Sequence, residues 1–158
     1  MSFDGRELRN AMGRFATGVC LITTVTEQQQ ALAMTANSFS SVSLDPPLAL
    51  WNLQDSSDVY DAFANPKYFA INILSSEQKD LSNHYAGKGQ HEIDPEHYRS
   101  GKHGAPIIRG ALVSLECELE AAYPGGDHLI IVGRILEMDE HPNGEPLVFY
   151  AGGYRELR

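Results

Sequence analysis

The chain has 158 residues, of which 42% are hydrophobic, and its formal net charge is −9. This composition is typical of one globular domain, residues 1–158, with Cys20 and Cys117 as buried thiols. The sequence has no basic run that could follow a phosphate backbone, no stretch near the roughly 20 apolar residues of a membrane span, and no signal-peptide core. We therefore expect a cytoplasmic protein with neither a nucleic-acid nor a membrane partner.

The first half of the chain predicts one helix and then strands. Asp4 and Glu7 have the spacing of a capping box, apolar residues then recur at helical intervals, and Gly18 is expected to end the helix. Residues 55–65 are expected to form a short second helix with a serine cap. Strands are predicted by the apolar or β-branched composition of segments 19–25, 31–35 and 48–53.

The second half continues as strands separated by turns. A helix capped by Ser75 or Ser76 is expected to end before Gly87. The alternation of residues 111–122 predicts a strand with one exposed face. Further strands are expected at 68–74, from 128 onward and near the C-terminus. Together these elements predict an antiparallel barrel or sheet with helices packed outside it.

Residues 88–106 are polar and irregular, and they include three of the six histidines. A loop of this length in a compact domain is typical of an active-site flap or a solvated surface loop. The spacing of His91, His97 and His103 matches no zinc-binding pattern, and no cysteine lies nearby. We therefore predict no metal site.

The most unusual stretch is residues 34–47, MTANSFSSVSLDPP, in which half of the residues are Thr, Ser, Asn or Asp. Phe39, Ser41 and Ser43 share one parity, which predicts an extended segment with one polar face. Two interpretations are open. The segment is either a surface strand whose hydroxyls face water, or a wall whose hydroxyls and amides face a heteroaromatic or phosphorylated ligand.

The pattern T-x-N-S-F-x-S-x-S-x-x-P-P-L in this stretch resembles the flavin-binding signature of the flavin reductase family, the small reductase partners of two-component monooxygenases. Three further elements follow in the family's order: F-x-x-N-x-L at 69–74, Gly126-Asp127-His128, and the ending F-Y-A-G-G-Y-R-E-L. The resemblance implies a mainly β (α+β) fold, an antiparallel six-stranded FMN-binding split β-barrel with flanking helices.

The resemblance also implies which residues meet the ligands. His128 is implied as the catalytic residue on the nicotinamide side of the flavin, although a histidine at a strand start also commonly bonds a turn carbonyl. Asn72 is either part of the flavin wall or a structural amide. The implied flavin-binding residues are Met34, Thr35, Ala36, Asn37, Ser38, Phe39, Ser41, Ser43, Ser56, Ser57, Asn72, Lys88 and Tyr154, the last of which would also frame the nicotinamide. Of these, Ser41, Ser43, Ser56 and Ser57 are implied for the sugar and phosphate, with Lys88 as a counter-charge.

The implied function is an NAD(P)H-dependent flavin reductase that transfers hydride to FMN or FAD and supplies reduced flavin to a partner oxygenase. A homodimer is expected from the family and because the edges of an antiparallel sheet need cover. Two alternatives stay open. One is a flavoprotein that keeps FMN bound and reduces another acceptor, and the other is a flavin-binding or electron-carrying module without turnover.

Overall fold

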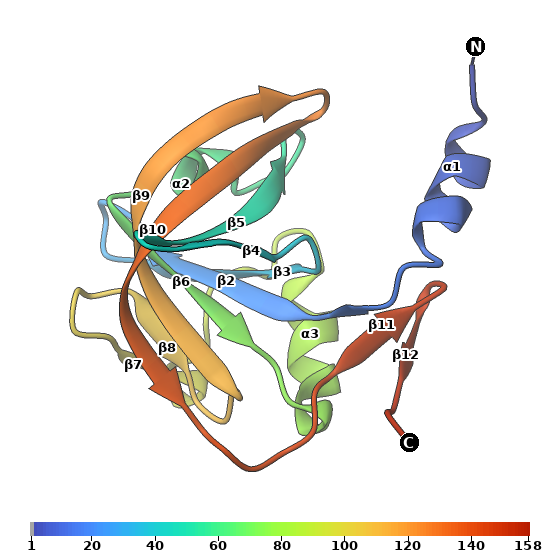
Figure 1. The fold of residues 1–158 in the computed structure, drawn as a ribbon. Helices are drawn as coiled ribbons and strands as arrows, with labels where there is room; N and C mark the ends of the chain where they lie inside the picture. Colours follow the sequence, from blue (N-terminus) through green and yellow to red (C-terminus); the bar gives the residue numbers. More distant parts are fainter. Residues whose placement is uncertain (1) are drawn as a thin grey trace.

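Residues 2–158 are described by a computed structural model, in which a curled antiparallel sheet is surrounded by short helices (Figure 1). The helices are α1 (Gly5–Met12), α2 (Tyr60–Ala64) and α3 (Lys79–Tyr85), with 3₁₀ turns at Ser76–Gln78 and Pro95–His97. The strands are β1 (Thr17–Gly18), β2 (Cys20–Val25), β3 (Ala31–Ala36), β4 (Ser40–Leu44), β5 (Pro47–Gln54), β6 (Tyr68–Ile73), β7 (Tyr98–Ser100), β8 (Pro106–Ile108), β9 (Val113–Gly125), β10 (His128–Glu140), β11 (Val148–Tyr150) and β12 (Gly153–Arg155).

Seven strands form the main sheet in the order β3-β2-β6-β9-β10-β5-β4, and every neighbouring pair is antiparallel. The expected mainly β, antiparallel architecture is confirmed, with one strand more than the expected six because β4 pairs with β5 at the sheet edge. Strands β1, β11 and β12 form a second small sheet, and β7 pairs with β8. In Figure 1, α1 and the β11–β12 hairpin stand to one side of the curled main sheet.

The barrel interior is filled by alternate residues of the strands. On β5, Ala49, Trp51 and Leu53 are buried while the residues between them are more exposed, as the period-2 geometry of a strand requires. Trp51 meets Phe63 of α2 edge to face, with ring centroids 5.8 Å apart. A second apolar cluster, which includes Tyr85 of α3, lies on the opposite face of β2 and β3.

Gly133 of strand β10 packs closely against core residues. A Cβ atom on Gly133 would lie 2.5 Å from Phe69 Cζ and 2.9 Å from Cys117 Cβ, so only glycine fits at this position. Cys20 and Cys117 are free and buried, as expected, and burial raises the pKa of each thiol to about 12.

The first helix is shorter than predicted. Asp4 caps it as expected, but α1 ends at Met12 and not at Gly18, because the chain turns at Gly13 and then pairs as β1 with β11. None of the residues of α1 is buried, which leaves its apolar side chains without intrachain packing. Within residues 2–158, no helix has the length and apolar character needed to cross a bilayer.

The predicted serine cap of the second helix is wrong. Helix α2 begins at Tyr60, and Val59 at its N-cap makes no side-chain capping bond. The Ser57 hydroxyl accepts a hydrogen bond from Val59 N at 3.2 Å, which closes a turn before the helix and does not cap it. Ser75, by contrast, begins the next helical segment with a complete capping box.

Strand β9 is not half exposed as predicted. Ser114 and Glu116, on its expected outer face, are both buried. The loop at 101–105 covers this face, and the Glu116 carboxylate accepts hydrogen bonds from His103 N and Ala105 N at 3.0 Å. A periodic pattern could not reveal this cover, because the loop is brought there by the tertiary fold.

Most residues of the polar segment 88–106 are exposed, as expected for a solvated loop, but two stretches of it pack against the fold. Beside β3, Ala33 N donates to His91 O at 2.8 Å and Ile93 N donates to Ala31 O at 3.0 Å. His91 and Ile93 are buried, and strands β7 and β8 follow. Within the part of the chain that the structure describes, no three potential metal ligands come together.

Candidate functional site

The hydroxyl-rich segment occupies the end of β3, the link to β4 and β4 itself, which are the two open edges of the main sheet. Met34, Ala36 and Phe39 pack against the barrel core and remain partly exposed. Thr35 lies between Met34 and Ala36 on β3 and therefore points to the opposite face. The predicted wall thus presents apolar surface at the barrel edge, and its residues are divided between two faces.

Thr35 and Tyr154 both form hydrogen bonds with Ser82 of α3. The Thr35 hydroxyl donates to the backbone carbonyl of Ser82 at 2.6 Å, and the Ser82 hydroxyl lies 2.6 Å from the Tyr154 hydroxyl. The Tyr154 hydroxyl also donates to Asn83 Oδ1 at 3.0 Å. This chain of contacts fastens β3 and the C-terminal hairpin to one helix, so both hydroxyls serve the fold in this structure.

The serines of the segment are not equivalent. Ser38 Oγ accepts a hydrogen bond from Asn52 N at 2.9 Å and ties the link to β5. A β-bulge lies between Ser41 and Ser43, so Ser41 pairs with Ala49 and Ser43 with Leu48. Since paired residues share a face of the sheet, the two serines lie on opposite faces, and the expectation of one continuous polar face is wrong.

Ser41 lies on the same face as the apolar wall, because its partner Ala49 belongs to the barrel core that Met34 and Phe39 also contact. Among the described residues, the side chains of Asn37, Ser41 and Ser43 have no intrachain hydrogen-bond partner, and Asn37 and Ser41 are exposed. Free short donors beside partly exposed apolar side chains suit a heteroaromatic ring that carries a polar chain. The donor set at this edge therefore fits a flavin.

His128 stands at the first position of β10, directly after a two-residue hairpin turn. Gly126 in the turn has a φ of +64°, and His128 pairs with Gly125 on one side and Gln54 on the other. Its Nδ1 lies 2.7 Å from Asp127 Oδ1. Because a carboxylate only accepts, Nδ1 carries the proton of this bond, and Nε2 has no partner among the described residues. The turn-carbonyl alternative for His128 is therefore not what the structure shows.

Asp127 also connects this rim to the end of β5. Its backbone carbonyl accepts a hydrogen bond from Asp55 N at 3.0 Å. The hydrogen bond from His128, followed by the attraction of that side chain, holds the pKa of the Asp127 carboxyl below its usual value of 3.8. The structure thus brings His128 close to the turn that carries Ser56 and Ser57.

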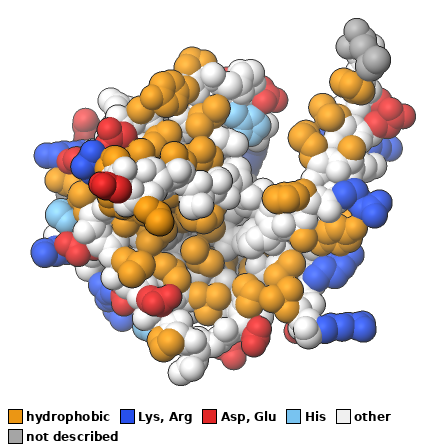
Figure 2. Space-filling view, in the orientation of Figure 1, with side chains coloured by type: hydrophobic (Ala, Val, Ile, Leu, Met, Phe, Trp, Pro, Cys, Tyr) orange, Lys and Arg blue, Asp and Glu red, His pale blue; other side chains and the backbone are white. Residues whose placement is uncertain are grey.

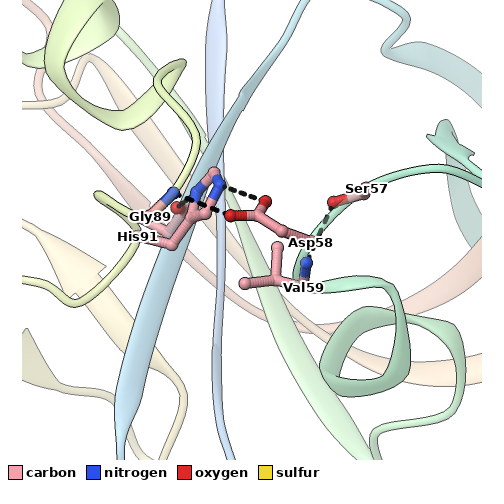
Figure 3. Close-up of polar contacts among 6 residues, drawn as sticks. Ser57, Asp58, Val59, Gly89 and His91 are labelled. Atoms are coloured by element: carbon pink, nitrogen blue, oxygen red, sulfur yellow. Dashed lines mark hydrogen bonds and ion pairs between the residues drawn. The ribbon is translucent and has the colours of Figure 1, made fainter.

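Asp58 and Gly89, the chain neighbours of Ser57 and Lys88, come from distant parts of the sequence and are in contact. Gly89, next to Lys88, donates its backbone N–H to Asp58 Oδ2 at 2.7 Å, and Figure 3 shows this contact beside Ser57 and His91. Ser56 and Lys88 are exposed. Their positions are compatible with the predicted contact to the anionic end of a flavin.

Asn72 does not form part of the predicted flavin wall. It is fully buried, and its amide makes four hydrogen bonds. The NH₂ group donates to Leu21 O and Thr23 Oγ1, while Oδ1 accepts from Ile108 N and Ser114 Oγ. Asn72 therefore has the structural role that the sequence left open, because every bonding position of its amide is used within the protein.

The predicted residues do not all converge within one chain. His128 lies at the tip of the β9–β10 hairpin, which stands apart from β12 and its Tyr154 in Figure 1, so the two do not frame one ligand there. Sequence reasoning missed Asp127, Asp58 and Ser82 as partners of predicted residues. Asp127 could have been found from the Gly-Asp-His motif, whereas the other two depend on long-range contacts.

Comparisons with known proteins agree with this geometry. Residues 12–158 match the family described as the flavin reductase like domain. The chain is 42% identical over 151 residues to the FMN reductase (NADH) SmoA of Agrobacterium fabrum, covering 96% of this chain and 85% of that protein. It is 33% identical to HsaB, the reductase subunit of a flavin-dependent monooxygenase of Mycobacterium tuberculosis, covering 96% and 81%.

The fold is also that of solved reductases. The NADH:FAD oxidoreductase SgcE6 of Streptomyces globisporus, solved with NAD and FAD fragments, superposes with a TM-score of 0.92 at 33% identity, covering 98% of this chain and 93% of that one. The expected split-barrel fold is confirmed by such neighbours. With its family signature matched from residue 12 to the C-terminus, the chain belongs to the flavin reductase family.

Proposed function

We propose that the chain is an NADH-dependent flavin reductase that passes hydride to FMN or FAD and supplies reduced flavin to a partner monooxygenase. The observation that carries this proposal is the similarity to the Agrobacterium NADH-dependent FMN reductase over 96% of this chain. The similarity to the monooxygenase subunit HsaB supports the partner. The proposal includes a cytoplasmic location, because the nicotinamide substrate is a cytoplasmic metabolite.

The hydride step is chemistry that the nicotinamide and the flavin supply when both are bound. The chain binds and orients them. Met34 and Phe39 offer the apolar wall for the ring, and Asn37 and Ser41 offer donors for its polar edge or chain. His128, held by Asp127, presents Nε2 to the second substrate at the barrel rim. Fixed placement of two reactants of this kind lowers the entropic part of the barrier.

Purified protein mixed with NADH and FMN tests the proposal, with NADH oxidation followed by absorbance. We expect turnover that rises with added flavin and saturates. If the protein is purified with bound flavin and its rate does not depend on added flavin, it would instead be a flavoprotein that reduces another acceptor. Flavin binding without NADH oxidation would identify a carrier module.

We also propose a homodimer, in which residues 1–158 form one domain whose α1 packs on the second copy. Leu8, Met12 and Phe15 of the N-terminal segment are 42%, 63% and 80% exposed. Figure 2 shows α1 standing away from the barrel with apolar side chains along it. A helix of eight residues is marginal in water without packing, so its apolar face needs a partner. Leu44 and Tyr123 are also exposed on the barrel, at 95% and 57%.

Light scattering at micromolar concentration tests the dimer. Wild-type protein should have twice the chain mass, and Met12→Glu with Phe15→Glu should yield monomers. Glu7→Gln, on the same helix but outside its apolar face, is the matched control and should remain dimeric. A monomeric wild-type protein with full reductase activity would contradict the proposal.

A further inference from the structure

A partly buried contact joins two loops beside the residues proposed for the anionic end of the flavin. His91 is 7% exposed, with Nδ1 2.9 Å from the Ala33 carbonyl oxygen and Nε2 2.9 Å from Asp58 Oδ1. The other carboxylate oxygen of Asp58 accepts the Gly89 N–H at 2.7 Å. Figure 3 shows the Asp58 carboxylate facing both Gly89 and His91. One carboxylate thus joins the turn after β5 to the segment after α3.

The contacts of His91 need both of its ring nitrogens as donors. A backbone carbonyl oxygen and a carboxylate oxygen can only accept hydrogen bonds. Both contacts are therefore hydrogen bonds only when both nitrogens carry protons and the ring is an imidazolium. With one proton absent, a ring lone pair would face an oxygen of Ala33 or Asp58, and a buried bond would be lost.

The surroundings of the pair are acidic. A cavity of about 900 Å³ adjoins it, and within the described part of the chain no lysine or arginine lines that cavity. The Gly89 N–H and then the His91 side chain hold the pKa of the Asp58 carboxyl below its usual 3.8, against the opposing effect of partial burial. The carboxylates that line the cavity are Glu27, Asp55, Asp58, Asp61 and Glu92.

The Asp58–His91 contact is adjacent in sequence to residues of the proposed flavin site. Asp58 follows Ser56 and Ser57 in the chain, and Gly89 follows Lys88. Ser57 lines the acidic cavity, whereas Ser56 and Lys88 do not, so an anion held by Ser56 and Lys88 would lie outside it. Asp58 therefore sets the spacing between the two elements on which those groups are carried.

We propose that Asp58 and His91 form a positioning clamp that holds the Ser56–Ser57 turn and Lys88 at the spacing needed to bind the anionic end of the flavin. Neither clamp residue touches the reacting atoms. The clamp rests on the proposed flavin reductase function and adds to it a pair of residues that act through their neighbours.

Flavin titration of variants tests the clamp. Asp58→Asn and His91→Gln should each weaken FMN binding by about 2- to 13-fold, the range for one displaced hydrogen bond. KM for NADH and kcat at saturating flavin should stay at wild-type values. Both single variants remove the Asp58–His91 bond, so the double variant should weaken FMN binding by less than the two single effects combined.

His97→Gln is the matched control. His97 lies in the same segment, but its Nδ1 contacts the Tyr85 hydroxyl at 2.9 Å, a group that can donate or accept. The His97→Gln variant should bind FMN with the affinity of the wild type.

Nitrogen-15 NMR of the histidine rings keeps the proposal falsifiable if His91→Gln does not fold. A proton on Nε2 of His91 in the wild type at neutral pH would support the clamp, and a bare Nε2 would overturn it. Folded Asp58→Asn and His91→Gln proteins that bind FMN as tightly as an active wild type would also overturn it. A wild-type protein that neither binds FMN nor oxidises NADH would instead refute the proposed function, and the clamp with it.

Discussion

Replacing His128 with alanine should lower kcat/KM for NADH and leave flavin affinity nearly unchanged. Nδ1 is committed to Asp127 at 2.7 Å, so Nε2 is the one ring nitrogen left for a ligand. Loss of one net hydrogen bond of about 0.5–1.5 kcal/mol corresponds to a decrease of about 2- to 13-fold in kcat/KM. Initial rates of NADH oxidation at saturating flavin, with a separate flavin titration, measure the two effects independently.

Asp127→Ala supplies the control for this prediction. If Asp127 acts by orienting the imidazole, its removal should lower kcat/KM in the wild type and have no further effect in His128→Ala. Flavin affinity that falls as far as kcat/KM would place His128 in the flavin wall. Unchanged kcat/KM and unchanged flavin affinity would leave His128 as a turn residue and refute the reasoning.

Three further changes should have distinct outcomes. Ser41→Ala should weaken flavin binding by about 2- to 13-fold in a fluorescence titration. Ser43→Ala should leave flavin binding unchanged, because Ser43 lies on the opposite face of the sheet. Equal effects of the two variants would contradict this assignment of faces. Gly133→Ala should lower the free energy of unfolding by about 1–3 kcal/mol, because the added Cβ meets the Phe69 ring; an unchanged urea midpoint would show that the core can give way. The pKa of Asp58 is lower in the folded protein than its unfolded value near 3.8. The Asp58 carboxylate therefore stabilises the folded protein at pH values above 3.8, and this stabilisation is lost as pH falls through the folded-state pKa. The Tm difference between wild type and Asp58→Asn should therefore disappear in acid, and a difference that persists there would have another cause.

The positions of the longer strands were predictable because they follow from local patterns. Alternation on β5 and the β-branched run of β2 mark those strands in the sequence, and the two-residue turn before His128 needs a glycine that the sequence displays at Gly126. The hydroxyl-rich segment was placed correctly at the strand ends for the same reason. Its bulge was not predictable, because the extra residue Val42 is revealed only by its pairing with β5.

Side-chain roles were predictable only where a motif carried them. Thr35 was expected to face a ligand, yet its hydroxyl bonds Ser82, which lies 47 residues away in the chain. Asn72 matched a family motif, but four long-range partners decide its role. His91 lay in a segment expected to be an active-site flap or a solvated loop, and the edge of β3 and Asp58 bury it. Contacts of this kind depend on the tertiary fold, which composition and spacing do not specify.

The rate of NADH oxidation as a function of added FMN tests the central claim most directly. The account predicts a rate that is near zero without flavin, rises with FMN to saturation, and falls in Ser41→Ala at subsaturating FMN. A rate that is independent of added flavin, or no NADH oxidation by a folded protein that binds FMN, would contradict it.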